Sequence, residues 1–232
     1  MDDQVFITGA ARGLGLAMTR QLLDRDCRVS VLVRSESQGL TELRSRYAER
    51  LTIYTGDVTD VASLDNAFAD VAARVGHLDL LINNAVIYLD NGRPPIEDID
   101  LSICARTFEV NSVGPLRVAQ RALPLVRKGK RKLIVNVSSE AGSIGDSKRK
   151  AEYAYCMSKS ALNMGSKILQ NHLAPEGIKV LALHPGWFNS SGEGPAPISA
   201  EQAAVIVLET ILKPQAVDAP MYVDPRGKAM AW

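Results

Sequence analysis

A tyrosine and a lysine four residues apart are the strongest chemical signal in this sequence. Tyr155 and Lys159 stand in a stretch that reads as the start of a helix, and Ser139 lies a short distance upstream. Because a helix turns about every 3.6 residues, side chains four apart point to the same side. A lysine ammonium beside a phenol favours the phenolate and lowers the pKa of the tyrosine. Tyr155 is therefore expected to give and take a proton, although an ordinary helix with a buried tyrosine and a solvated lysine would show the same spacing.

A glycine-rich turn near the N-terminus predicts a nucleotide site. An apolar run at residues 5–7, expected to be a strand, meets the sequence Thr8-Gly9-Ala10-Ala11-Arg12-Gly13-Leu14-Gly15, and an apolar-periodic helix follows. Glycines let the backbone of a tight turn approach a pyrophosphate, which amide groups and the positive end of the helix dipole then hold. The spacing favours a dinucleotide site over a plain connecting loop. The expected contacts are Gly9, Arg12, Gly13, Leu14 and Gly15.

Two arginines favour a phosphorylated cofactor. The second expected strand, residues 28–33, ends at Arg34, where a dinucleotide fold faces the adenosine ribose. An acidic residue at that place suits a free 2′-hydroxyl, whereas an arginine suits a 2′-phosphate. Arg34 and Arg12 together predict NADP(H) rather than NAD(H), although each arginine taken alone could be a solvated loop charge.

Side chains that follow the next two expected strands extend the nucleotide site. Asp57 is expected to accept a hydrogen bond from the adenine amino group while Val58 packs on the ring. The alternative is that Asp57 belongs to the capping region of the next helix. Asn84 and Ala85 follow a nearly continuous apolar strand and are expected to contact the cofactor.

Strands and helices alternate along the chain, which predicts βαβ units and one parallel sheet with right-handed crossovers. The further expected strands are residues 51–55, 78–82, 133–137, 178–183 and 221–223, and the further expected helices are residues 36–47, 61–75, 98–126 and 200–212. Asn111 lies near the middle of the longest helix. Gly114-Pro115 directly after it predicts a kink, which would free a backbone carbonyl for a water or for Lys159.

The whole chain argues against several classes of function. Its 232 residues predict one domain, 1–232, and 27 Lys plus Arg against 26 Asp plus Glu argue against a nucleic-acid partner. The basic run at residues 127–132 is expected to be a solvated connection. Three scattered cysteines suit neither a disulfide framework nor a zinc site, so we expect no metal and a reducing, cytoplasmic location. We find no signal-peptide pattern and no run of about 18 apolar residues that would predict a membrane partner.

In order and spacing, these signals resemble the short-chain dehydrogenase/reductase family along essentially the whole chain. The matching positions are the glycine turn, Asp57-Val58, Asn83-Asn84-Ala85, Asn111, Ser139, Tyr155, Lys159 and Pro185-Gly186. The resemblance implies an α/β Rossmann-type fold, in which a doubly wound, seven-stranded and mainly parallel sheet has helices on both faces. It also implies a catalytic tetrad of Asn111, Ser139, Tyr155 and Lys159.

Within that family, the chain looks like the small carbonyl reductases related to the sniffer and C-factor proteins. Its short length, Arg34, the sequence His184-Pro185-Gly186-Trp187 and the ending Asp224-Pro225-Arg226-Gly227-Lys228 carry this likeness. A flexible loop at about residues 187–198 is expected to close over the pocket. The expected cofactor contacts in this part are Pro185, Gly186, Phe188 and Ser190, the last for the carboxamide, and the expected substrate contacts are Ser139, Tyr155 and Trp187.

Departures from the family pattern concern the pocket. Val86 stands where the family usually has glycine, so the loop below the nicotinamide is expected to sit differently. Ser139 and Tyr155 are 155 − 139 = 16 residues apart, a few more than usual, because residues 146–152 add a charged stretch. We expect that stretch to widen a loop at the rim of the substrate pocket. His184, which precedes a proline, is expected to pack rather than to titrate.

The expected activity is hydride transfer between NADP(H) and a small carbonyl compound or secondary alcohol. Ser139 and Tyr155 would bind the carbonyl oxygen, and Tyr155 would donate the proton. Lys159 would lower the pKa of Tyr155 and bind the nicotinamide ribose, while Asn111 would hold a water that links Lys159 to solvent. Alternative substrates are an imine, an enone or another biosynthetic intermediate, and an alternative function is a low-turnover, NADP(H)-binding regulatory protein. Relatives often pair through the helices that carry Asn111 and Tyr155, so a homodimer or homotetramer is one expectation.

Overall fold

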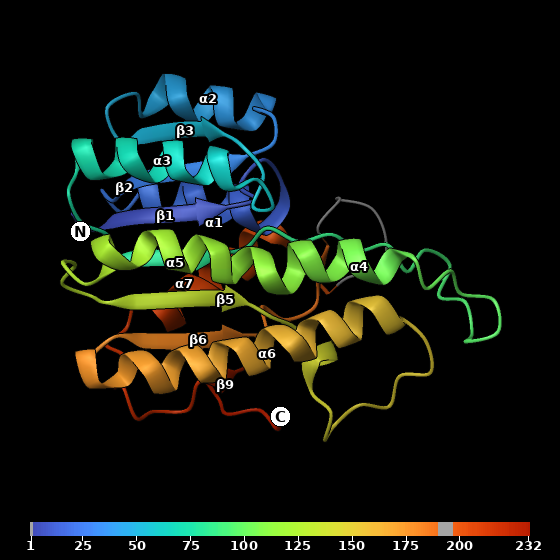
Figure 1. The fold of residues 1–232 in the computed structure, drawn as a ribbon. Helices are drawn as coiled ribbons and strands as arrows, with labels where there is room; N and C mark the ends of the chain where they lie inside the picture. The colour runs from blue at the N-terminus through green and yellow to red at the C-terminus, as the bar shows by residue number, and fades with distance from the viewer. Residues whose placement is uncertain (1, 190–196) are drawn as a thin grey trace.

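Seven parallel strands form the centre of the molecule (Figure 1). The computed structural model describes residues 2–189 and 197–232. The sheet has the order β3-β2-β1-β4-β5-β6-β9, which confirms the expected doubly wound topology. The strands are β1 (Gln4–Thr8), β2 (Arg28–Val33), β3 (Leu51–Thr55), β4 (Leu80–Asn83), β5 (Leu133–Val137), β6 (Lys179–Leu183) and β9 (Tyr222–Val223).

Helices cover both faces of the sheet, and each face has its own apolar core. The central strand β1 shows the division, because Val5 and Ile7 join one core and Phe6 joins the other. One core contains side chains of α1 (Gly13–Leu23), α2 (Gln38–Arg46) and α7 (Ala200–Ile211). The other contains side chains of α3 (Val61–Arg74), α5 (Gly114–Val126) and α6 (Tyr153–Leu173).

The long helix expected at residues 98–126 begins later and is interrupted. Asp100 accepts hydrogen bonds from the backbone N–H and the hydroxyl of Ser102, which makes a turn where the helix was expected, so α4 spans only Ile103–Phe108. A π-helical segment, η1 (Glu109–Val113), then joins α4 to α5. Pro115 has no N–H to donate to the carbonyl of Asn111. The helix is therefore irregular where the sequence predicted a kink.

The chain after β6 holds a feature that the sequence did not predict. The short strands β7 (Phe188–Asn189) and β8 (Ile198–Ser199) pair in parallel in a sheet of their own. Ser199 also starts α7 with a capping box, in which its side chain and that of Gln202 accept each other's backbone N–H. At the end of the chain, the carbonyl of Trp232 accepts the N–H of Gly145, so the last residues return to the loop after β5.

Two arginines of the basic run at residues 127–132 have acidic partners. Arg127 lies 2.6 Å from Glu176, and Arg131 lies 2.7 Å from Asp3. These pairs agree with a structural connection between α5 and β5. In the part of the chain that the structure describes, no helix has the length and apolar character needed to cross a membrane, and no three His, Cys, Asp or Glu side chains are grouped to hold a metal ion.

Candidate active site

The glycine turn is packed so closely that Gly9 and Gly15 have no room for side chains. Gly9 and Gly13 have φ angles of 71° and 55°, in the left-handed region. A Cβ on Gly9 would lie 2.7 Å from the Cα of Ala85, and one on Gly15 would lie 2.5 Å from Nδ2 of Asn84. Helix α1 starts at Gly13 and makes no side-chain capping bond, so its first N–H groups can bind an anion.

Asn84 and Ala85 pack against this turn. The Asn84 amide donates to the carbonyls of Thr8 and Gly9 at 3.1 and 3.0 Å, and the Thr8 hydroxyl accepts the N–H groups of Asn84 and Ala85 at 3.1 Å. These bonds join the ends of β1 and β4, where the strand order reverses and open sheets of this kind bind ligands. Val86 follows with its side chain half exposed.

Asp57, the residue expected to bind the adenine, takes part in a local turn. Its Oδ1 accepts the N–H and hydroxyl of Thr59 at 2.9 and 2.8 Å, and its Oδ2 lies 3.4 Å from the Arg106 guanidinium. Burial opposes ionisation, but these bonds and the charges of Arg106 and Arg34 leave the pKa of Asp57 lowered. The structure thus contains the capping alternative. The charge of Arg34 also acts on the same carboxylate. Val58 packs in the core beside α5.

Ser139 and Tyr155 come together at the carboxyl edge of the sheet. Ser139 follows β5 and caps a short 3-10 helix, η2 (Glu140–Gly142), while Tyr155 is in the first turn of α6. Burial raises the pKa of Tyr155 to about 12, the hydrogen bond with Ser139 acts in the opposite direction, and the charge of Glu140 adds to the rise. The carbonyl of Ser139 accepts the hydroxyl of buried Tyr222 at 2.7 Å. The two expected catalytic hydroxyls are therefore neighbours.

Lys159 lies beside Tyr155 but does not lower its pKa. The Lys159 ammonium lies 5.7 Å from the centre of the Tyr155 ring and donates to the carbonyl of Val137 at 2.8 Å. Burial lowers the pKa of Lys159 to about 7. The expected lowering of the tyrosine pKa is wrong for this arrangement, because burial raises that pKa and the lysine itself carries only part of its charge at neutral pH.

The Asn111 side chain braces the site. Its Oδ1 accepts the N–H of Ile87 at 2.9 Å, and its Nδ2 donates to the Ile87 carbonyl and the Ser158 hydroxyl at 2.9 and 3.1 Å. With 1% of its surface exposed, Asn111 joins the loop after β4 to α6. The amide group is occupied by these three bonds, which leaves its backbone carbonyl as the group that could hold the expected water.

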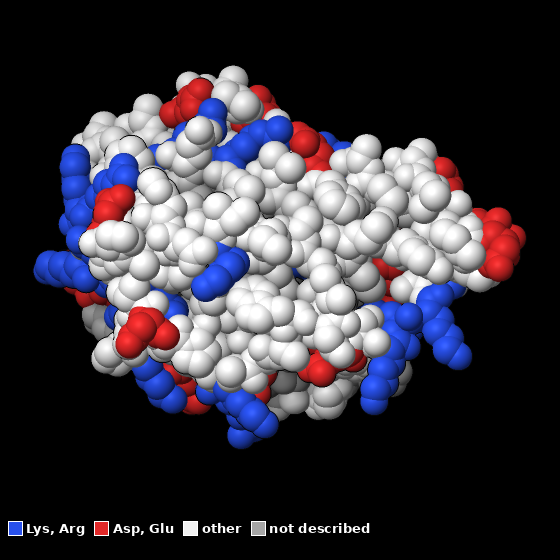
Figure 2. All heavy atoms as spheres, turned by 60° about the horizontal axis from the view of Figure 1, so that its bottom comes forward, with Lys and Arg blue, Asp and Glu red and all other residues white. Residues whose placement is uncertain are grey.

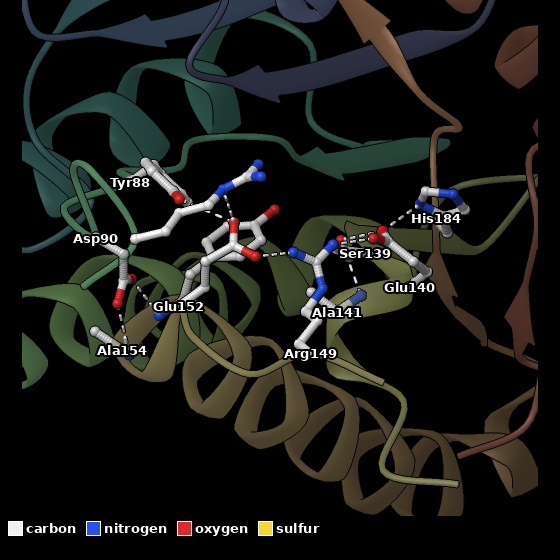
Figure 3. A network of polar contacts seen from close by, with 11 residues as sticks. Tyr88, Asp90, Ser139, Glu140, Ala141, Arg149, Glu152, Ala154 and His184 are labelled. Atoms are coloured by element: carbon white, nitrogen blue, oxygen red, sulfur yellow. Dashed lines mark hydrogen bonds and ion pairs between the residues drawn. The ribbon is translucent and has the colours of Figure 1, made fainter. Parts of the chain in front are cut away.

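Asp90 holds the start of the catalytic helix and was not singled out from the sequence (Figure 3). Its two carboxylate oxygens accept the N–H groups of Ala154 and Tyr155 at 3.1 and 2.8 Å, and its side chain is buried. Glu152, at the N-cap position of α6, has a φ of 68° and makes no side-chain capping bond. Asp90 therefore replaces a local cap from 64 residues away, and no local sequence pattern could have indicated it.

Replacing Asp90 by asparagine is expected to lower both stability and turnover. The amide has one acceptor oxygen and no charge, so one of the two helix N–H groups loses its partner, at about 1 kcal/mol of unfolding free energy. Urea unfolding and kcat measure the two effects. Asp60→Asn is the matched control, because Asp60 caps α3 through one bond to the N–H of Ala62, which an amide oxygen keeps, so both stability and kcat should change little. An Asp90→Asn variant with unchanged kcat would show that the cap does not position Tyr155.

The charged stretch at residues 146–152 folds onto the site through ion pairs (Figure 3). Arg149 bonds to both Glu140 and Glu152. Glu152 also accepts the Tyr88 hydroxyl at 2.8 Å and lies 3.3 Å from the Arg93 guanidinium. The sequence predicted a widened loop at the pocket rim, but the structure shows a loop tied to the residue next to Ser139.

The residues expected to contact the nicotinamide follow β6, at the same edge of the sheet. Gly186 has a φ of 85°, Trp187 is 64% exposed, and Phe188 belongs to β7. Pro185 precedes them, and Ser190 lies outside the described residues. His184 is largely buried, and burial lowers its pKa, in keeping with the expected packing role.

Comparisons with known proteins cover most or all of the chain. A family model described as short chain dehydrogenase matches residues 3–197. C-signal of Myxococcus xanthus is 36% identical over 160 residues, which cover 68% of this chain and 94% of that protein. The carbonyl reductase Sniffer of D. melanogaster superposes with a TM-score of 0.93 at 28% identity, over 100% of both chains. An NADPH-bound carbonyl reductase from chicken fatty liver superposes with a TM-score of 0.89 at 29% identity, over 100% of this chain and 94% of that one.

Proposed function

Because this chain belongs to the short-chain dehydrogenase/reductase family of NAD(P)-dependent oxidoreductases, we propose that it transfers a hydride between NADP(H) and a small carbonyl compound or secondary alcohol. The observation that carries the proposal is the meeting of the Ser139 and Tyr155 hydroxyls beside buried Lys159. Tyr155 is the general acid in reduction and the general base in oxidation.

The cofactor site is supported by the tight glycine turn and the uncapped start of α1. When bound, the nicotinamide supplies or accepts the hydride. The turn holds the pyrophosphate, Arg12 and Arg34 hold the 2′-phosphate, and Lys159 binds the ribose near the reacting carbon. The remaining proposed contacts are Asp57 and Val58 for the adenine, and Asn84, Ala85, Pro185, Gly186, Phe188 and Ser190 for the nicotinamide half.

The two hydroxyls act on the substrate oxygen. Ser139 and Tyr155 donate hydrogen bonds to the carbonyl, and Tyr155 gives its proton as negative charge develops on that oxygen. Since the pKa of Tyr155 is raised to about 12, its hydroxyl is protonated at neutral pH, as an acid in the reducing direction requires. A water on the Asn111 carbonyl links Lys159 to solvent, so that Tyr155 can be reprotonated. Trp187 contacts the rest of the substrate.

Consumption of NADPH with a panel of aldehydes, ketones and quinones tests the activity. At least one carbonyl compound should be reduced, and turnover should disappear in the Tyr155→Phe variant. If only imines or enones are reduced, the substrate is one of the alternatives to a carbonyl compound, which the same residues can serve. Tight NADPH binding without turnover of any substrate would favour the second candidate function, a regulatory protein. The name of the relative C-signal is the reason to consider it.

Arg34→Asp should weaken NADPH binding far more than NADH binding. An arginine forms charge-assisted hydrogen bonds with a phosphate, and an aspartate would repel it, so the dissociation constant of NADPH should rise about 10- to 100-fold. Titration of both cofactors measures the difference. Arg74→Asp, at the other end of α3 from the site, makes the same charge change and should spare the preference. Equal effects of Arg34→Asp on both cofactors would mean that Arg34 does not bind the phosphate.

An apolar surface on α5 and α6 supports a homodimer or homotetramer. Leu116, Met164 and Ile168 are 37%, 62% and 62% exposed. Figure 2, which brings the lower side of Figure 1 forward, shows charged side chains of both signs with broad uncharged areas between them. Burial of such side chains between subunits favours association.

We further propose that residues 1–232 act as one nucleotide-binding domain in the cytoplasm. Two apolar cores share the central sheet, which supports one domain. The three cysteines, Cys27, Cys104 and Cys156, form no disulfide, in keeping with a reducing compartment. The proposed closing loop at residues 187–198 includes residues 190–196, which lie outside the described part of the chain.

A further inference from the structure

The Ser139 hydroxyl has one hydrogen and two competing acceptors. In the structure it donates to Oε2 of Glu140 at 2.7 Å, while its oxygen accepts the N–H of Ala141 at 3.1 Å. The proposed reaction needs the same hydrogen on the substrate oxygen. A carboxylate is a strong acceptor for a hydroxyl hydrogen, so Glu140 competes with the substrate for Ser139.

Arg149 is the cation that neutralises Glu140. Its guanidinium bonds to Oε1 of Glu140, the oxygen that Ser139 does not use, and to Glu152 (Figure 3). Glu152 has Arg93 as a second cation at 3.3 Å. His184 lies 3.6 Å from Glu140, and burial lowers its pKa, which favours the neutral ring. The charge next to Ser139 is therefore balanced by Arg149.

The same two charges reach Tyr155 with opposite effects. The Glu140 carboxylate raises the pKa of Tyr155, and the Arg149 guanidinium lowers it. The other groups around the phenol are the Tyr88 ring, 5.4 Å away on the loop after β4, and Cys156 and Lys159 on α6. Tyr88 and Cys156 have raised pKa values because they are buried, so both are neutral near pH 7.

We propose that Glu140 and Arg149 are a positioning pair for the catalytic hydroxyls: Glu140 holds the Ser139 hydrogen, and Arg149 neutralises Glu140 so that Ser139 can turn to the substrate oxygen. The proposal rests on the proposed function, because the hydroxyls are catalytic only in that reaction. No covalent bond changes in this step, since Ser139 only rotates its hydroxyl from one acceptor to another.

Kinetics of three variants test the release of Ser139. Arg149→Met leaves Glu140 without its cation, so kcat for carbonyl reduction should fall about 10- to 100-fold, the effect of one strengthened charged hydrogen bond. Glu140→Gln keeps an acceptor without the charge, so its kcat should fall far less than that of Arg149→Met. The double variant should regain most of the lost kcat. A purely structural ion pair would predict losses in both single variants and no rescue.

A titration that needs no turnover tests the charges at Tyr155. Tyrosine is labelled with carbon-13 at Cζ, and the Tyr155 resonance is assigned by its absence in Tyr155→Phe. Glu140→Gln should lower the titration midpoint of Tyr155 by about one pH unit, and Arg149→Met should raise it. Arg93→Met is the matched control, because it removes a cation from Glu152 and leaves Glu140 paired. The titration midpoint of Tyr155 should stay unchanged in this control variant.

These results distinguish a failure of the proposed role of Glu140 and Arg149 from a failure of the proposed function. Opposite midpoint shifts in a protein that turns over no substrate would support the pair and reject the carbonyl-reductase proposal. Turnover of a carbonyl compound with no shift in either variant, or with shifts in the same direction, would overturn the pair. If Arg149→Met does not fold, Glu140→Gln alone decides, because the proposal requires its midpoint to fall.

Discussion

The Tyr155→Phe variant is expected to reduce carbonyl compounds at least about 10²- to 10⁴-fold more slowly than the wild type. The substitution removes only the hydroxyl that would give its proton to the substrate oxygen. Ser139 and Lys159 keep their partners Glu140 and Val137. Binding of NADPH should therefore remain, and the loss should appear in kcat rather than in the dissociation constant of the cofactor. Stopped-flow or steady-state NADPH consumption, together with a fluorescence titration of NADPH, measures both quantities.

Tyr153→Phe provides the control for this experiment. It removes a hydroxyl from the first residue of the same helix, and Tyr153 has no place in the proposed mechanism. Its kcat should match that of the wild type. An active Tyr155→Phe enzyme would remove Tyr155 from the role of general acid. In the oxidising direction, where the phenolate is needed, the wild-type rate should rise with pH, because the pKa of Tyr155 is raised to about 12.

Lys159→Met should abolish most turnover and, at the same time, change how stability depends on pH. The ordinary lysine pKa of 10.5 applies to the unfolded chain, and burial lowers it to about 7 in the folded chain. Between these two values the unfolded chain binds more protons, so stability should rise with pH in that interval. Well below the lower value the lysine is charged in both states, and the full cost of burying the ammonium remains. Methionine removes that cost, which is about a few kcal/mol of unfolding free energy. It also removes the hydrogen bond to Val137, so the net gain in stability is smaller.

Urea unfolding of wild type and Lys159→Met from pH 6 to 9 measures this effect. The wild type should gain stability with rising pH, and the variant should show a flatter dependence. Lys213→Met, which removes an exposed lysine after α7, should keep the wild-type slope. Lys179 is also buried with a lowered pKa, but it is present in every protein compared and cancels in the difference. Parallel slopes for wild type and Lys159→Met would contradict the assigned burial of the ammonium.

Local patterns were sufficient for the parts of the site that depend on neighbours in the chain. The spacing of Tyr155 and Lys159 places both on one side of α6, and the glycine turn between β1 and α1 needs residues without a Cβ. Alternating apolar segments indicated the parallel sheet, because each βαβ unit is short and local. The interruption after Asn111 followed from Pro115, which has no N–H to donate.

Side-chain contacts, some local and some long-range, decided what these patterns could not. The start of α4 moved to Ile103 because the Asp100 carboxylate makes a competing turn. The Asn111 side-chain amide is occupied by Ile87 and Ser158, which leaves the backbone carbonyl of Asn111 for the expected water. The Asp57 carboxylate bonds in a local turn, as the capping alternative required, and its adenine role stays a prediction.

By itself, therefore, the sequence determined the order of strands and helices, the nucleotide-binding turn and the identity of the residues that meet at the carboxyl edge of the sheet. Only the tertiary structure decided their protonation and their orientation. Burial, which depends on the whole fold, raises the pKa of Tyr155 and lowers that of Lys159. Asp90 caps the catalytic helix from 64 residues away, and Arg149 reaches Glu140 across a loop. Such effects depend on distances in space, and a pattern along the chain records only distances in sequence.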